Sequence, residues 1–206
     1  DPLCNMLMDL SPDIIGMQEV MNSSGYPQLS DVNSKVSSVY SHHVFEPSDF
    51  LETVGEANKP SMTNVLMWKT SMFDMVEKGL QFFTGDGSYG EVPSSEAWGY
   101  CTDNSRRSFQ WVKLTHKLSG KTVWVFNTHF PVNNTNHTND NPTGDNSKAR
   151  EVCMTKMVEK AYELCGDEAV VYFTGDFNSA YSRADAFVLD VATSWLYDAR
   201  TETEDR

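Results

Sequence analysis

The sequence predicts an α+β domain, in which strands and helices form packed layers. Residues 107–130 hold two runs of alternating apolar and polar residues around the turn sequence LSGK at 118–121, which is the pattern of an antiparallel hairpin. Residues 147–164 repeat apolar side chains at helical spacing, and an apolar run at 169–174 follows them. The second arm of the hairpin, this helix and this run therefore predict a strand–loop–helix–strand unit. With 206 residues, the chain is long enough for one domain with a two-layer core.

Shorter elements are expected in the first half of the chain. Residues 3–10, LCNMLMDL, have the pattern of the end of an amphipathic helix that is stopped by Ser-Pro. Residues 13–20, DIIGMQEV, alternate in the manner of a strand. The stretch 21–60 is rich in Ser, Gly, Pro and Asn, so we expect loop with short elements there. Residues 64–70, NVLMWKT, predict a strand that continues through a turn into a second strand within 71–83.

Polar stretches separate the elements of the second half. Residues 84–106 are rich in glycine and residues 131–146 are almost entirely polar, so both predict loops. The helix at 147–164 is expected to end at Gly166. One side of this helix is apolar and is expected to face the core; it consists of Cys153, Met154, Met157, Val158, Ala161, Leu164 and Cys165.

The composition bounds the class of protein. The hydrophobic content of 39% is that of an ordinary globular protein, and no apolar run reaches the roughly 20 residues of a membrane span. The net charge of −13 argues against a sequence-independent binder of long DNA or RNA, because such binding needs a basic surface. The first residues lack the basic and apolar regions of a signal peptide. Because the chain opens without Met, we expect a processed form or a fragment.

The cysteines show no CxxC spacing, so a structural zinc site is not expected. Cys153 and Cys165 stand about 18 Å apart on one predicted helix, too far for a mutual disulfide. We interpret Cys153 as a core residue and leave Cys4 and Cys101 open. Three N-glycosylation sequons begin at Asn22, Asn133 and Asn136. They favour export slightly and leave a cytoplasmic location open, because sequons are used only in the secretory path.

Polar side chains stand where three apolar strands end. Glu19 ends the first of these strands, Asn127 and His129 end the second, and Asp176 and Asn178 follow the third. Side chains two residues apart on an extended segment share a face, so each pair is expected to point one way. If the three strands are neighbours, Glu19, His129, Asp176 and Asn178 form a pocket of two carboxylates, one amide and one imidazole.

Oxygen ligands of this kind suit a hard divalent cation, so the sequence predicts Mg²⁺ or Mn²⁺ rather than Zn²⁺. A cation in this pocket would polarise a phosphoryl oxygen. His129 would act as a general acid or base near neutral pH, or as a hydrogen-bond donor to the phosphate.

The segments DIIGMQEV, RSFQW, NTHF and GDFN, in this order, resemble the endonuclease/exonuclease/phosphatase superfamily, which includes pancreatic deoxyribonuclease, neutral sphingomyelinases and inositol-phosphate 5-phosphatases. The resemblance covers residues 3 to 199. It implies a four-layer α/β/β/α sandwich of two packed mixed sheets, formed by a single domain over residues 1–206. It also implies that the domain is incomplete at both ends, because the family's first strand should precede Asp1 and its Ser-Asp-His segment should follow residue 206.

The same resemblance implies a role for each polar residue at the strand ends. Glu19 matches the family's metal-binding Glu, and Asp176 is expected to share the metal and to help activate the attacking water. Asn178 is expected to contact phosphate, and His129 matches the catalytic His of the deoxyribonuclease-like branch. Two further residues, Arg107 and Asn127, are expected to bind substrate. A Glu that many members carry stands here as Met62, which argues against the nuclease branch in particular.

The sequence therefore predicts a Mg²⁺- or Mn²⁺-dependent hydrolase of phosphodiester or phosphomonoester bonds, of nuclease, phosphatase or phospholipase C type. The acidic charge favours a small molecule, a lipid head group or the end of a nucleic-acid strand as the substrate, and we expect a monomer. Two alternatives remain open. One is a catalytically impaired binding or structural module on the same scaffold, and the other is a secreted protein whose acidic loops bind Ca²⁺ only structurally.

Overall fold

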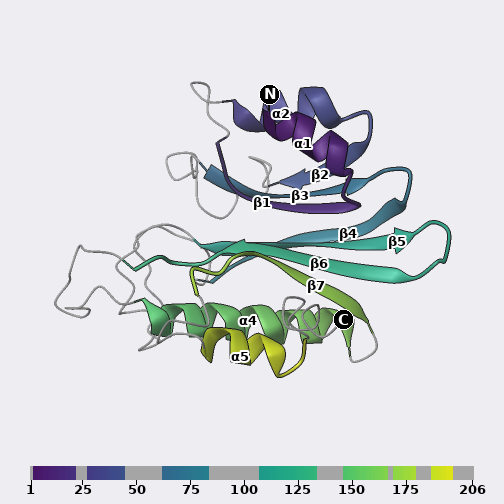
Figure 1. Cartoon of the computed structure of the whole chain (residues 1–206). Helices are drawn as coiled ribbons and strands as arrows, with labels where there is room; N and C mark the ends of the chain where they lie inside the picture. The colour runs from purple at the N-terminus through teal and green to yellow at the C-terminus, as the bar shows by residue number, and fades with distance from the viewer. Residues whose placement is uncertain are drawn as a thin grey trace, which may run out of the picture.

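Two β-sheets pack face to face, and helices cover both outer faces, so that the chain has four layers (Figure 1). The structure is a computed structural model that describes residues 2–21, 27–44, 62–83, 107–133, 146–166, 169–179 and 187–196. The predicted loop at 84–106 and most of the one at 131–146 lie outside these residues, as do Asn22, Cys101 and Asn136. The α/β/β/α sandwich that the resemblance implied is confirmed.

The first half of the chain forms one sheet and its helical cover. The strands β1 (Ile14–Met21), β3 (Met62–Lys69) and β2 (Tyr40–Val44) lie in the order β1-β3-β2, and both pairings are antiparallel. The helices α1 (Pro2–Leu10) and α2 (Gln28–Val36) pack on this sheet through a shared core. The predicted helix end and both predicted strands are confirmed. Helix α2 was expected only as a short element within 21–60, because its apolar residues are few: Leu29, Val32 and Val36.

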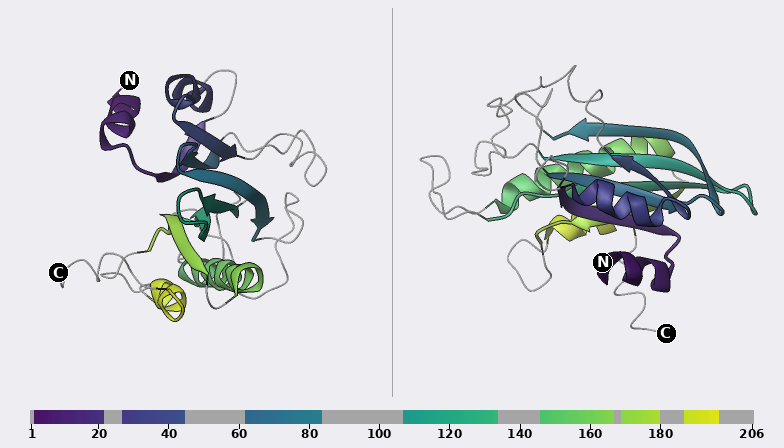
Figure 2. Two further views of the ribbon diagram at one scale, coloured as in Figure 1. Left: turned by 90° about the vertical axis from the view of Figure 1, so that its right-hand side faces the viewer. Right: turned by 90° about the horizontal axis from the view of Figure 1, so that it is seen from above.

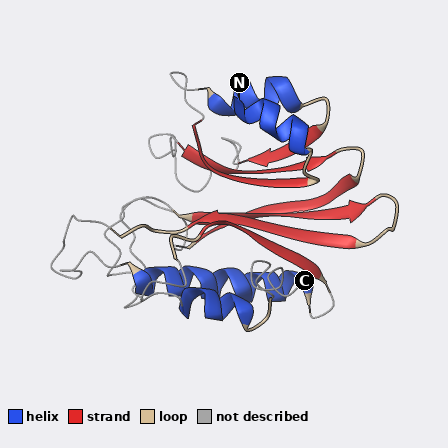
Figure 3. Ribbon diagram, viewed as in Figure 1, coloured by secondary structure: helices blue, strands red, loops and turns tan. Residues whose placement is uncertain are grey.

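The remainder of the chain forms a four-stranded sheet in the order β4-β5-β6-β7. The strand β4 (Phe73–Phe82) pairs with β5 (Ser108–His116), and β5 forms the predicted antiparallel hairpin with β6 (Thr122–His129). The strand β7 (Val170–Asp176) runs parallel to β6, so helix α4 (Ser147–Cys165) is the crossover of the predicted strand–loop–helix–strand unit. Figure 3 shows the two sheets as separate layers between the helices.

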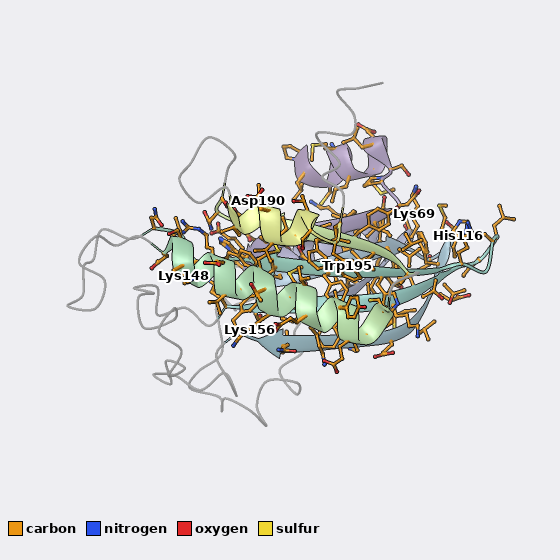
Figure 4. The ribbon with its side chains drawn as sticks, turned by 90° about the horizontal axis from the view of Figure 1, so that it is seen from below. Lys69, His116, Lys148, Lys156, Asp190 and Trp195 are labelled. Carbon is orange, nitrogen blue, oxygen red and sulfur yellow. The ribbon has the colours of Figure 1, made fainter. Side chains whose placement is uncertain are left out.

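Helix α4 covers the outer face of this sheet with the predicted apolar side. Cys153, Met154, Met157 and Ala161 are fully buried there, and Val158, Leu164 and Cys165 pack at the edge of the same core. The helix ends before Gly166, whose φ of 67° is a value that glycine adopts more easily than other residues and whose N–H still donates to the carbonyl of Tyr162. Helix α5 (Phe187–Thr193) lies alongside α4, as the view from below shows (Figure 4).

Between the sheets lies a third core, made of Leu66, Trp68, Phe73, Val112, Leu114 and Val125. These apolar residues fix how the sheets face one another, and the polar residues of the strand ends lie beyond them. Figure 2 shows the same stack from the side and from above. None of the described helices is both long enough and apolar enough to cross a membrane.

Candidate active site

The predicted residues meet where β1, β6 and β7 end. Strands β6 and β7 are in parallel register, and His129 pairs with Asp176 at their last residues. Strand β1 lies across them in the facing sheet, where the side chain of Gln18 donates a hydrogen bond to Asn127 over 2.7 Å. The C-terminal ends of the three strands therefore lie together, at the left-hand end of the sandwich in Figure 1.

His129 lies between the two carboxylates. Its Nδ1 is 3.9 Å from Oε1 of Glu19, and its Nε2 is 3.8 Å from Oδ2 of Asp176. The imidazole side chain is 12% exposed, whereas those of Glu19 and Asp176 are 63% and 53% exposed. Each ring nitrogen thus faces one carboxylate, at a distance longer than a hydrogen bond, and both carboxylates stay open to solvent.

Glu19 reaches this position through an irregularity in β1. The register with β3 shifts between Met17, which pairs with Val65, and Val20, which pairs with Thr63. Two residues of β1 therefore oppose one residue of β3, which is a β-bulge. Glu19 has a φ of 57°, in the left-handed region that residues with a Cβ rarely occupy. The bulge turns the end of β1, so that the Glu19 carboxylate faces His129.

A tight turn fixes the end of β7. Oδ1 of Asp176 accepts a hydrogen bond from the backbone N–H of Asn178 at 2.9 Å, so one oxygen of this carboxylate is held in place. Asn178 has a φ of 48°, and its side-chain amide donates to the carbonyl of Phe130 at 2.9 Å. The expectation that Asp176 and Asn178 lie on one extended segment is therefore wrong, because β7 ends at Asp176 and Asn178 closes a turn.

Arg107 lies beside the same strand end. Its side chain is half-buried, and its Nη1 is 3.5 Å from the backbone carbonyl oxygen of His129. The guanidinium thus lies next to the strand end that carries the imidazole.

Asn127 lies in the interior, whereas a substrate-binding residue must reach the surface of the site. Its side chain is fully buried between the sheets. Its Nδ2 donates to the carbonyls of Met17 and Val65, at 2.9 and 3.0 Å, and its Oδ1 accepts from Gln18. Because these bonds occupy the amide and no part of it reaches the surface, the expectation that Asn127 binds substrate is corrected to a role within the fold.

Sequence reasoning missed Arg150, which supports the segment after His129. The guanidinium of Arg150 is buried on α4 and donates through Nη1 to the carbonyl of Pro131 at 3.0 Å and to Oδ1 of Asn133 at 2.9 Å. Asn146, just before α4, donates to the carbonyl of Val132 at 2.7 Å. A charged residue at a core-facing position of a helix was the available signal, because such residues are buried only when they have partners.

A divalent cation fits the chemistry of Glu19 and Asp176. Carboxylate oxygens are hard ligands, both groups are open to solvent, and no lysine or arginine in the described part of the chain forms an ion pair with either of them. Within the same part of the chain, no three acidic, histidine or cysteine side chains cluster closely enough to form a complete metal site.

Comparison with known proteins yields structural neighbours only. No protein-family model and no curated protein matches the chain. An endonuclease/exonuclease/phosphatase from Bacteroides vulgatus aligns with a TM-score of 0.66 and 19% identity, over 91% of this chain and 60% of its own. The mannosyl-6-phosphatase Bt3783 of Bacteroides thetaiotaomicron gives 0.64 and 20%, over 91% and 59%. TDP2 of D. rerio, complexed with a single-stranded DNA product, gives 0.59 and 17%, over 93% and 56%.

The chain spans between 56% and 60% of the length of these three proteins, and the identities of 17–20% show a shared fold. The order of the elements and the two-sheet sandwich are thus those of known proteins of the group that the motifs indicated. The chain therefore has the fold of the endonuclease/exonuclease/phosphatase proteins.

Proposed function

We propose that the chain is a phosphoesterase domain that hydrolyses phosphodiester or phosphomonoester bonds where β1, β6 and β7 end. The observation that carries the proposal is the position of His129 between Glu19 and Asp176, within 4 Å of each. Proteins with this fold include a mannosyl-6-phosphatase and a TDP2 bound to a single-stranded DNA product, which supports a phosphoester substrate.

Glu19 and Asp176 would hold a Mg²⁺ or Mn²⁺ ion in this proposal. When bound, such an ion polarises a phosphoryl oxygen and neutralises developing negative charge. Asp176 is suited to orient a water molecule as well, because one of its oxygens is already fixed by the N–H of Asn178. The ordered carboxylate then presents its other oxygen towards His129, from which it is 3.8 Å distant.

His129 would move a proton at the reacting phosphate. Its imidazole is mostly buried but lies between two solvent-exposed carboxylates, so it is held in place and remains reachable by a ligand. Arg107, next to the backbone of His129, would contribute positive charge to the transition state. Asn178 would contact the phosphate from the turn after β7.

The substrate class follows from charge. A chain with a net charge of −13 repels a long polyanion, so we propose a small or lipid-linked phosphoester, or the end of a nucleic-acid strand.

A binding module without catalysis is the second candidate. The observation in its favour is that, among the described residues, no three acidic, histidine or cysteine side chains are placed to hold one metal ion, although His129 lies close to Glu19 and Asp176. A module of this kind would bind a phosphoester and release it unchanged.

The test is turnover of a substrate panel in the presence of Mg²⁺ or Mn²⁺. The panel contains bis-p-nitrophenyl phosphate, inositol phosphates, sphingomyelin and oligonucleotides. Glu19→Ala and Asp176→Ala are each expected to lower kcat/KM by about 100-fold or more, because each removes charge that acts on the transition state. Glu159→Ala is the matched control, since Glu159 is an exposed acid on α4 away from the strand ends.

A thermal-shift titration separates the two candidates. Mg²⁺ is expected to raise the melting temperature of the wild type and to leave that of Glu19→Gln unchanged, because binding to the folded state stabilises it. Metal binding without turnover of any substrate would favour the binding module. Full turnover in Glu19→Ala and Asp176→Ala would overturn the assignment of the site.

A further inference from the structure

A buried hydrogen-bond network joins the two sheets directly behind the candidate site. At its centre, the Asn127 amide donates to the backbone carbonyls of Met17 and Val65, at 2.9 and 3.0 Å. Its Oδ1 accepts from Nε2 of Gln18 at 2.7 Å and lies 3.1 Å from Oγ1 of Thr174. One side chain of β6 thereby contacts β1 and β3 in the facing sheet and β7 in its own.

Each member of this network is next to a residue of the site. Gln18 directly precedes Glu19 on β1. Asn127 and His129 share a face of β6, because they are two residues apart on a regular strand. Thr174 and Asp176 stand in the same relation on β7. The network thus holds the strand backbone just before each of the three site residues, Glu19, His129 and Asp176.

The bulge explains why such a network is needed. Met17 and Val65 pair at the point where the register of β1 and β3 begins to shift, and Asn127 bonds both of their carbonyls. Glu19 lies in the bulge with a positive φ, a conformation that persists only where surrounding contacts enforce it. Gln18 and Asn127 supply hydrogen bonds of this kind from the side that faces the second sheet.

Close packing supports the same conclusion independently. A Cβ atom on Gly16 would lie well inside contact distance of Oγ1 of Thr174 and 3.0 Å from Oδ1 of Asn127. The backbone of β1 therefore lies closer to Thr174 and Asn127 than it could if residue 16 had a side chain.

We infer that Gln18, Asn127 and Thr174 are positioning residues, which hold the β1 bulge so that the Glu19 carboxylate stays in register with His129 and Asp176. The inference rests on the proposed function, since it assigns these three residues to the geometry of that reaction. They touch no substrate; they act through the strand ends that they join.

The experiment uses the full chain and substitutions of nearly equal shape. Gln18→Met removes the donor to Asn127. Thr174→Val removes the hydroxyl, and Thr174→Ser restores it. Thr155→Val is the matched control: Thr155 is also half-buried and its Oγ1 also donates to a backbone carbonyl, that of Glu151 at 2.9 Å, but it lies on α4, outside both sheets.

For a substrate that the wild type turns over, Gln18→Met and Thr174→Val are expected to lower kcat by about tenfold to 100-fold with little change in KM, because misplaced catalytic groups slow the chemical step. Thr155→Val is expected to keep kcat within about twofold, whatever it does to the melting temperature. Thr174→Ser is expected to recover most of the kcat that Thr174→Val loses. Equal kcat in Thr174→Val and Thr155→Val would overturn the inference.

Amide hydrogen exchange gives a readout that does not depend on activity. Exchange at residues 17–20 is expected to become faster in Gln18→Met and Thr174→Val, and to stay unchanged in Thr155→Val. A wild type without turnover would refute the proposed function and leave this readout to decide whether the network holds the bulge. Unchanged exchange at residues 17–20 in all variants would show that it does not.

Discussion

Glu19 combines a carboxylate of the candidate site with an unfavourable backbone conformation. Its φ of 57° would suit glycine, yet a glycine could not supply the charge that faces His129. The sequence showed Glu19 as an acid at a strand end, and this part of the prediction holds. The bulge that aims the side chain was not predictable, because the segment DIIGMQEV alternates regularly and only the pairing with β3 reveals the extra residue.

This conformation predicts a reversed preference between glycine and alanine. Glu19→Gly is expected to be more stable than Glu19→Ala by about 1 kcal/mol in free energy of unfolding, because a Cβ is disfavoured at positive φ. Urea denaturation measures this difference. Lys78, exposed on the part of β4 that pairs in regular register with β5, is the matched control, and there alanine is expected to be the more stable substitution. If Glu19→Ala equals or exceeds Glu19→Gly in stability, the left-handed conformation is contradicted.

Cys165 gives a prediction about pH. Burial raises the pKa of its thiol from 9.0 to about 12; Lys113 opposes this shift and Glu77 adds to it. A raised pKa means that the folded state keeps the proton where the unfolded state has lost it. The stability from this thiol is therefore complete below pH 9 and is lost as the pH rises towards 12.

Urea denaturation at pH 8 and pH 10.5 measures this effect. The wild type is expected to lose more free energy of unfolding between the two conditions than Cys165→Ser, which has no thiol to ionise. Other groups that titrate in this interval are common to both proteins and cancel in the difference. An equal loss in the two proteins would contradict the assignment to Cys165.

At the scale of elements, hydrophobic periodicity predicted the long, regular elements correctly but did not locate the short helix α2. The hairpin and α4 each repeat their pattern over many residues, and both lie where the sequence placed them. Helix α2 is only nine residues long and mostly polar, so tertiary packing of a few apolar residues determines it. The turn after β7 depends on Asn178 adopting positive φ, which the pattern of an extended segment did not anticipate.

The buried side of α4 predicts the cost of a cavity. Met157→Ala is expected to lower the free energy of unfolding by about 2–5 kcal/mol, since Met157 is fully buried against the β4–β7 sheet. Met75→Ala, at a position on β4 that is 44% exposed, is expected to change it far less. Denaturant titration checks both, and similar losses at the two methionines would contradict the packing of α4.

At the scale of the molecule, the site exists only because two sheets from different halves of the chain meet. The sequence identified residues at three strand ends, and β6 and β7 belong together through their parallel register. Nothing in the pattern of β1 showed that it lies across them, and that placement came from the family resemblance. Asn127 illustrates the limit, because a polar residue near a strand end has the same sequence signature whether it binds a ligand or joins two sheets.

The distance between the sheets is itself testable at Gly16. Gly16→Ala is expected to lower the free energy of unfolding by about 1–3 kcal/mol, because its Cβ would collide with Thr174 and force the sheets apart. Thr174→Ala removes the hydroxyl that the new Cβ would contact. The double variant is therefore expected to lose less free energy of unfolding than the sum of the losses in the two single variants. A double-mutant cycle by urea denaturation measures this coupling. Strictly additive effects would mean that β1 and β7 do not contact each other at these two residues. The end of β1 would then not be held next to the ends of β6 and β7, as the site requires.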